Sequence, residues 1–263
     1  MRYARIFLLH FQYVFEHRGR SFIWFLNSLL NPLIILLFWQ AAIATNRNIG
    51  FSFPFITSYY LLSIIATSVL ISHVEEDIAK EDIHQGNLSM YIIRPFSYFW
   101  INFFEELPYR LLQGSFGLIS LILLVGVFNL PLLLNLDIQK VLLSICIAIL
   151  AYILSFTFKC IFAFLAFWVI DIGGMEQLLD IVILLLGGII VPISFLPLFL
   201  QNIAQILPFS YMIYYPIIAF MGQLSIPELF SILKIQILWL VVFWFCYQYL
   251  WRNGLKAYTG VGQ

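Results

Sequence analysis

Hydrophobic residues along this chain gather into long runs instead of alternating with polar ones. Six runs carry almost no charge: residues 22–44, 54–74, 111–128, 141–168, 177–196 and 229–250. Their only charged members are Lys159, Asp180 and Lys234. A membrane-crossing helix needs roughly 20 mostly apolar residues, whereas a barrel strand shows about ten residues of alternating polarity. The pattern predicts an all-α polytopic membrane protein with six transmembrane helices in a single domain, residues 1–263.

The composition agrees with a membrane environment. Hydrophobic residues make up 63% of the 263 residues, charged residues make up 10%, and the mean hydropathy is +0.98. Such a chain has too little polar surface to cover a water-soluble globule. The net charge is zero, so no basic surface typical of nucleic-acid binding is expected, and the three cysteines lack metal-site spacing. The sequence therefore predicts neither a nucleic-acid partner nor a metal site.

Residues 1–21 have a different pattern. Four arginines lie among apolar residues that recur at helical spacing. This pattern predicts an amphipathic helix on the inner membrane surface.

Basic residues indicate the orientation of the chain, because cytoplasmic loops are enriched in lysine and arginine. With a cytoplasmic N-terminus and six crossings, nine basic residues lie inside and two, Arg47 and Lys140, lie outside. A seventh crossing would move Arg252 and Lys256 outside and change the ratio to seven against four. We therefore expect a multi-pass protein of the bacterial inner membrane with both termini cytoplasmic.

A proline-rich stretch separates the fifth and sixth runs. The part between Pro197 and Pro208 is about ten residues long, roughly 15 Å as a helix, which is half of a bilayer core. A helical wheel of this part places Gln201, Asn202 and Gln205 on one side. The apolar residues lie on the other side: Phe199, Ile203, Ile206 and Leu207. We predict a re-entrant helical hairpin over residues 192–222. We expect its prolines and polar side to form an outer gate: Pro192, Pro197, Gln201, Asn202, Gln205, Pro208 and Pro216.

The longest charged stretch between runs follows the second one. Residues 75–97 begin with acidic residues around Ile78 and Ile83. This pattern is typical either of a solvated loop or of a short helix with two apolar anchors for a partner. The candidate docking residues are Glu75, Glu76, Asp77, Ile78, Lys80, Glu81, Asp82 and Ile83.

A few polar residues lie in or beside the apolar runs. Inserting a lysine such as Lys159 at the centre of a transmembrane helix costs roughly 2.5–3.5 kcal/mol, so Lys159 is a functional candidate by default. Snorkelling of its side chain to the membrane interface is the simpler explanation. Ser63 and Thr67, four residues apart, indicate either close helix packing or the polar wall of a pathway. Glu106 and Arg110 predict a surface ion pair, provided that the helix continues past the nearby proline.

The ordered pieces of the sequence resemble the membrane subunit of a type-2 ABC exporter. The matching pieces are "DIHQGNLSMYIIRP", "FAFLAFWV", "GGIIVPISFLPLFLQNIAQILPFSYMIYYPIIAFMGQ" and "YLWRNGLKAYTGVG", and together they cover most of the chain in the expected order. The acidic run "EEDIAKED" is a departure from the family pattern. The resemblance implies a dimer of permeases, identical or different, over two ATPase subunits, with the segment after span two docked on the ATPase.

The energy source must then lie on another chain. The sequence has no G-x-x-x-x-G-K-[ST] phosphate loop, so ATP and magnesium are expected on the partner ATPase and no cofactor on this chain. An enzyme is not expected, because the histidines are scattered and no catalytic motif appears. A secondary, ion-coupled transporter is the alternative, although such folds place broken helices in repeated halves and this sequence shows one interruption.

Overall fold

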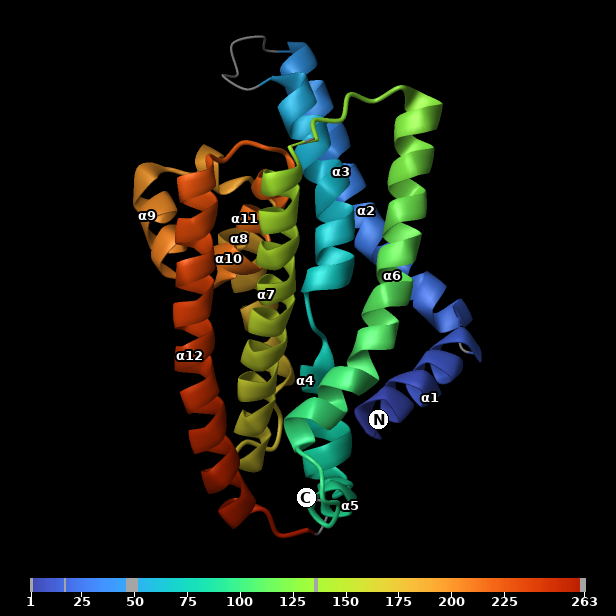
Figure 1. The fold of residues 1–263 in the computed structure, drawn as a ribbon, viewed down its shortest axis with the longest axis vertical. Helices are drawn as coiled ribbons and strands as arrows, with labels where there is room; N and C mark the ends of the chain where they lie inside the picture. The colour runs from blue at the N-terminus through green and yellow to red at the C-terminus, as the bar shows by residue number, and fades with distance from the viewer. Residues whose placement is uncertain (1, 17, 46–51, 135–136, 261–263) are drawn as a thin grey trace.

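The computed structural model describes residues 2–16, 18–45, 52–134 and 137–260, and within these ranges the chain is helical and contains no strand. Four helical stretches are long and apolar enough to cross a membrane: Phe53–His84, Tyr98–Phe128, Ile138–Phe167 and Ile226–Ala257. The all-α prediction is confirmed, and the chain has the architecture of a multi-pass membrane protein (Figure 1).

The N-terminal part consists of two helices. Helix α1 (Arg2–Glu16) ends before the predicted boundary at residue 21, and α2 (Arg18–Thr45) follows it. Figure 1 shows α1 lying obliquely across the lower part of α6 (Tyr98–Phe128), while α2 runs upward beside α3 (Phe53–Leu70). The Tyr3 ring stacks on Phe104 with centroids 5.6 Å apart, which fixes α1 against α6.

Helices α7 (Ile138–Ala163) and α12 (Ile226–Ala257) run side by side from the level of the short helices α9–α11 toward the lower end (Figure 1). Each begins at a capping residue: Asp137 accepts a hydrogen bond from the Gln139 amide, and Ser225 forms a capping box with Glu228. A side-chain carbon at Gly254 would collide with the Phe167 ring, so this glycine allows the end of α12 to pack closely.

Helix α8 (Gly173–Leu186) is shorter than the predicted fifth span. Fourteen residues make about 21 Å of helix, less than the roughly 30 Å of a bilayer core. The fifth span was expected to end near Pro192, whereas the helix ends at Leu186 and Gly188 adopts a left-handed φ of 83°.

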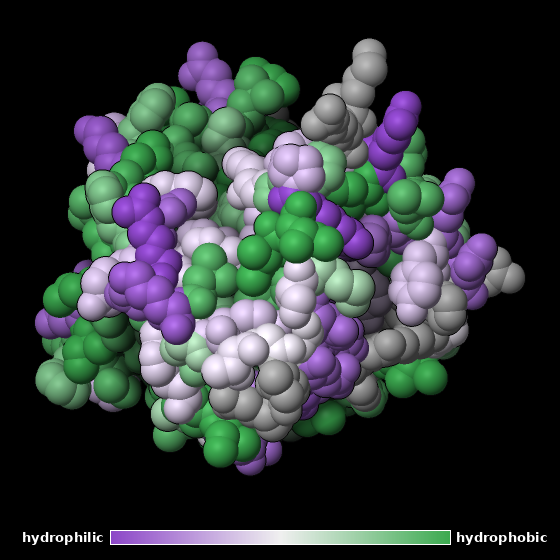
Figure 2. All heavy atoms as spheres, turned by 90° about the horizontal axis from the view of Figure 1, so that it is seen from below, coloured by the Kyte–Doolittle hydropathy of each residue, from purple (hydrophilic) through white to green (hydrophobic). Residues whose placement is uncertain are grey.

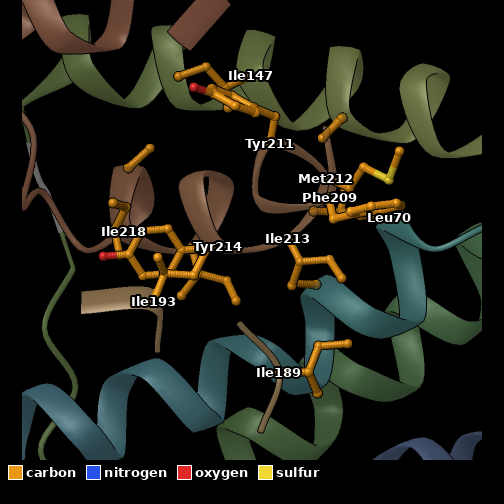
Figure 3. Close-up of a cluster of buried hydrophobic side chains, with 14 of the residues drawn as sticks. Leu70, Ile147, Ile189, Ile193, Phe209, Tyr211, Met212, Ile213, Tyr214 and Ile218 are labelled. Carbon is orange, nitrogen blue, oxygen red and sulfur yellow. The ribbon is translucent and has the colours of Figure 1, made fainter. Parts of the chain in front are cut away.

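The proline-rich stretch folds into short helices joined by turns. These are η3 (Ile193–Phe195), α9 (Leu198–Ile206), α10 (Phe209–Met212) and α11 (Tyr214–Phe220). The labelled helices α9, α10 and α11 lie in the upper half of Figure 1, near the start of α12. Side chains of α10 and α11 fill the space between α7 and α3, where Met212 and Ile213 belong to one buried cluster with Ile147 and Leu70 (Figure 3).

Below α3 the helix is interrupted at residues 71–73. The chain continues as α4 (Val74–Glu76), a π-helical segment η1 (Asp77–His84) and α5 (Leu88–Ile92). Figure 2 views this lower end directly and shows hydrophilic residues distributed among hydrophobic ones.

Candidate functional site

The interruption below α3 is held by a buried carboxylate on α6. Glu106 accepts hydrogen bonds from the Ser72 hydroxyl at 2.8 Å, the His73 amide at 3.0 Å and the Tyr152 hydroxyl at 3.2 Å. It also pairs with Arg110 Nε at 2.9 Å. Helix α6 does continue past its internal proline, but the predicted surface location of the Glu106–Arg110 pair is wrong, because both side chains are buried. A buried pair with several added hydrogen bonds orients the backbone of the break.

Lys159 on α7 forms a second buried cluster. Its side chain is 1% exposed, and its Nζ lies 2.5 Å from Glu75 Oε1 and 3.2 Å from Asp180 Oδ1. The snorkelling interpretation of Lys159 is therefore wrong. Its ammonium group does not reach water at the membrane interface, and two carboxylates compensate its charge inside the protein. One lysine thus joins α4, α7 and α8.

Two carboxylate oxygens near this cluster have no hydrogen-bond partner within the described part of the chain. They are Glu75 Oε2 and Glu176 Oε1, both buried. The lower end of the molecule therefore concentrates acidic groups around one buried lysine.

The two apolar anchors expected on the charged segment are not available to a partner. Ile78 and Ile83 are buried in a cluster with Phe164 and other residues of this chain. The anchor prediction is wrong, because the π-helical turn directs these side chains to the chain's own core. Asp82 is also buried and accepts a hydrogen bond from the Tyr98 hydroxyl.

The remaining candidates on this segment face outward. Four are exposed: Glu76, Asp77, Lys80 and Glu81. Lys80 pairs with Glu76 at 2.6 Å across one turn, which is worth little at an exposed site. The exposed apolar residues lie further along, on α5 and after it: Met90, Ile92 and Ile93. Ile93 is 83% exposed, so the apolar residues that this end leaves exposed are different from the two anchors that the sequence predicted.

The upper end of α3 contacts the proline-rich stretch. The Tyr59 hydroxyl donates to the Gly188 carbonyl at 2.7 Å, and the Tyr60 hydroxyl donates to the Ile190 carbonyl at 2.7 Å. Trp39 on α2 donates in turn to the Tyr60 hydroxyl at 2.9 Å. These bonds satisfy carbonyls that the end of α8 leaves without helical partners.

Side chains within the stretch satisfy further carbonyls. Gln201 donates to the Leu196 carbonyl at 2.7 Å, and Gln236 on α12 donates to the Tyr211 carbonyl at 2.9 Å. The predicted gate residues differ in placement: Pro192, Pro208 and Pro216 are buried, Gln201 is half-buried, and Pro197, Asn202 and Gln205 are exposed. The predicted apolar side of α9 is not buried in this chain, because Phe199 and Ile206 are exposed and the small Ala204 packs inward.

Ser63 and Thr67 donate to carbonyls of their own helix. Ser63 bonds to the Tyr60 carbonyl at 2.8 Å and Thr67 to the Ser63 carbonyl at 2.8 Å. Ser63 is buried and Thr67 half-buried, which agrees with close helix packing of α3.

Helix α3 therefore connects two unusual regions. Its upper half holds the backbone after α8, and its lower end runs into the break bound by Glu106 and the segment bound by Lys159. The sequence did not single out Tyr59 or Tyr60, because two adjacent tyrosines in an apolar run carry no pattern that reveals a distant carbonyl. Lys159 could be singled out from the sequence, because it is an ionisable residue inside an apolar run.

No group of three or more His, Cys, Asp and Glu residues in the described ranges could hold a metal ion. The buried charges instead join helices to one another, and the long apolar helices define a multi-pass membrane protein.

The chain belongs to the ABC-2 transporter family. The model described as "ABC-2 family transporter protein" matches residues 29–262. No match was found among curated proteins or among solved structures. Family membership confirms the resemblance to a type-2 ABC permease subunit and implies an ABC transporter system with a partner ATPase. A member of this family is a membrane transport component.

Proposed function

We propose that this protein is the membrane-spanning permease subunit of an ATP-driven exporter and forms the export pathway as a dimer above separate ATPase subunits. The observation that carries the proposal is the double attachment of α3. The charged segment below it is fixed to α7 and α8 through Lys159, and Tyr59 and Tyr60 hold the backbone that leads into the proline-rich stretch. A displacement of the charged segment by an ATPase would therefore be passed to the other end of the molecule.

In this proposal the chain crosses the membrane six times, with α2 as the first crossing and α8 with the residues after it as the fifth. Residues 192–222 enter and leave on the outer side as a re-entrant hairpin and form the outer gate. Short helices joined at prolines can tilt without unfolding a full span. The nine-to-two distribution of basic residues supports cytoplasmic termini at the bacterial inner membrane.

Cysteine labelling tests this topology. In a background with Cys146 and Cys246 replaced by serine, we expect Leu134→Cys to react with an impermeant thiol reagent in intact cells. Lys256→Cys should react only after the cytoplasm is opened, because α12 places it at the opposite end from the loop before α7. Labelling of Lys256→Cys in intact cells contradicts six crossings.

We place the ATPase contact on the exposed part of residues 75–97. The acidic side chains form a rim suited to a basic surface, and Met90 and Ile93 supply exposed apolar contacts beside it. Ile78 and Ile83 stabilise the segment from inside.

Copurification with the coexpressed ABC ATPase tests this contact. We expect Met90→Asp and Ile93→Asp to reduce ATPase recovery at least about tenfold, because a charge replaces an apolar contact residue. Leu134→Asp is the matched control, since Leu134 is 48% exposed against 53% for Met90 but lies at the other end of the molecule. Unchanged recovery with both variants removes this surface from the contact, and transport by the reconstituted chain without any ATPase supports the ion-coupled alternative.

A further inference from the structure

A groove at the lower end of the molecule shares Tyr91, Ile92, Phe96 and Ser97 with the segment that the proposed function assigns to the ATPase contact, and its other lining residues have no role there. It encloses about 360 Å³ between the chain leading into α6 and the C-terminal half of α12. Six of its ten lining residues are aromatic: Tyr91, Phe96, Tyr98, Trp244, Tyr247 and Trp251. This volume lies within the range of small-molecule sites, which is roughly 300–1,000 Å³.

The aromatic wall is rigid because its rings pack on one another. Tyr98 stacks on Trp251 with centroids 4.7 Å apart and an interplanar angle of 13°. Trp244 stacks on Tyr247 at 5.6 Å, and Tyr91 meets Tyr98 edge to face at 5.5 Å. Ring faces carry the negative part of the aromatic quadrupole and attract cations.

The groove also lies along the part of α12 where apolar and charged residues meet. From Trp244 to Leu255 the helix rises by roughly 16 Å. Exposed Phe245 and Tyr249 flank the upper part, and Arg252 and Lys256 lie at the charged end. Tryptophan and tyrosine gather at this level of membrane proteins, where lipid headgroups meet the acyl chains.

Charges of both signs surround the groove. Burial raises the pKa of the Tyr91 hydroxyl well above its usual range, and the nearby carboxylates of Glu105, Asp82 and Glu81 raise it further. Asp82 lies directly behind the wall and accepts the hydrogen bond from Tyr98. Cations lie near the groove as well: Arg252 and Lys256 on α12, and Arg94, whose guanidinium carbon lies 5.4 Å from the centre of the Tyr91 ring.

We propose that this groove binds the headgroup of an inner-leaflet phospholipid that carries a positively charged amine, namely phosphatidylethanolamine. The ammonium group lies against the Trp244 ring, which is 40% exposed, while the buried Tyr247 ring supports Trp244 from behind. The phosphate lies toward Arg94 at the rim, and the acyl chains extend along the exposed apolar side of α12. The inference uses the proposed function only for the orientation of this end toward the cytoplasm.

Lipid retention by the purified full-length chain tests the proposal without any ATPase or transport. The protein is reconstituted in nanodiscs of phosphatidylglycerol with or without phosphatidylethanolamine, extracted, and examined by native mass spectrometry. We expect one phosphatidylethanolamine per chain to remain bound. Trp244→Leu should weaken retention by about 3- to 30-fold through loss of the cation–π contact, and Trp244→Phe should restore part of it.

Trp100→Leu is the matched control, because Trp100 is 42% exposed against 40% for Trp244 and does not line the groove. Equal retention of both lipids, or equal loss in the Trp244→Leu and Trp100→Leu variants, overturns the proposal. Displacement of the lipid by a soluble alkyltrimethylammonium probe, with no preference between the two phospholipids, also overturns it and assigns the groove to small amphiphilic cations. Because the docking variant Ile93→Asp leaves the groove lining intact, it should lose the ATPase and still retain the lipid.

Discussion

Replacing Lys159 by methionine is expected to lower the free energy of unfolding by about 3–5 kcal/mol, enough to reduce the yield of folded protein severely. The change leaves Glu75 as a buried carboxylate without its cation, since Lys159 is its hydrogen-bonded partner at 2.5 Å. The loss of Lys159 destabilises the Asp180 carboxylate less, because this side chain is 60% exposed and water can solvate it. Thermal unfolding of the detergent-purified protein measures the effect.

The double variant Lys159→Met and Glu75→Met separates stability from function. Removing both charges eliminates the unpaired carboxylate, so we expect the folded yield and the unfolding temperature to recover. ATP-driven export should stay low, because the charged segment is no longer fastened to α7 and α8.

Lys234→Met is the control for loss of a lysine from an apolar helix, since Lys234 is exposed on α12. Equal unfolding temperatures for Lys159→Met and the parent contradict the assigned pairing. Parental export by the double variant shows that the cluster only stabilises the fold.

Removing the hydroxyls of Tyr59 and Tyr60 together should loosen the backbone between α8 and α9. Each change to phenylalanine leaves a carbonyl, at Gly188 or Ile190, without its donor. Leaving the buried Gly188 carbonyl unpaired costs about 1–3 kcal/mol, and the part-buried Ile190 carbonyl loses less. We expect faster amide hydrogen exchange over residues 187–197 and a several-fold loss of export. Recovery of the ATPase in copurification should be unchanged, because the docking surface lies at the other end of α3.

Tyr249→Phe is the control for this pair, because Tyr249 is an exposed tyrosine in the C-terminal half of α12, whereas the stretch lies near the start of that helix (Figure 1). If hydrogen exchange rises equally in the control, the hydroxyl bonds of Tyr59 and Tyr60 do not hold this backbone. If exchange rises in the double variant but export is unaffected, the stretch does not act as a gate.

The sequence by itself determined that the chain is helical and belongs in a membrane. Long uncharged runs can satisfy their backbone polar groups in a bilayer only as helices, so composition and run length were sufficient. The prolines also predicted correctly that the stretch after residue 192 is broken into short helices, because proline lacks the amide donor that a continuing helix needs.

Local pattern failed where a distant partner sets the environment of a residue. Lys159 and the Glu106–Arg110 pair were expected at an interface or surface because a charge alone is costly inside, yet Glu75 and Tyr152 come from other helices to compensate them. Ile78 and Ile83 were expected outside because acidic residues flank them, but the π-helical turn directs them inward. The end of α8 was misplaced because Tyr59 and Tyr60, more than 120 residues earlier, supply the donors that allow the backbone to leave the helix at Gly188. Run length and composition thus predicted a helical membrane protein. Only the tertiary structure decided where α8 ends and which charges are paired, since both depend on contacts between residues far apart in the chain.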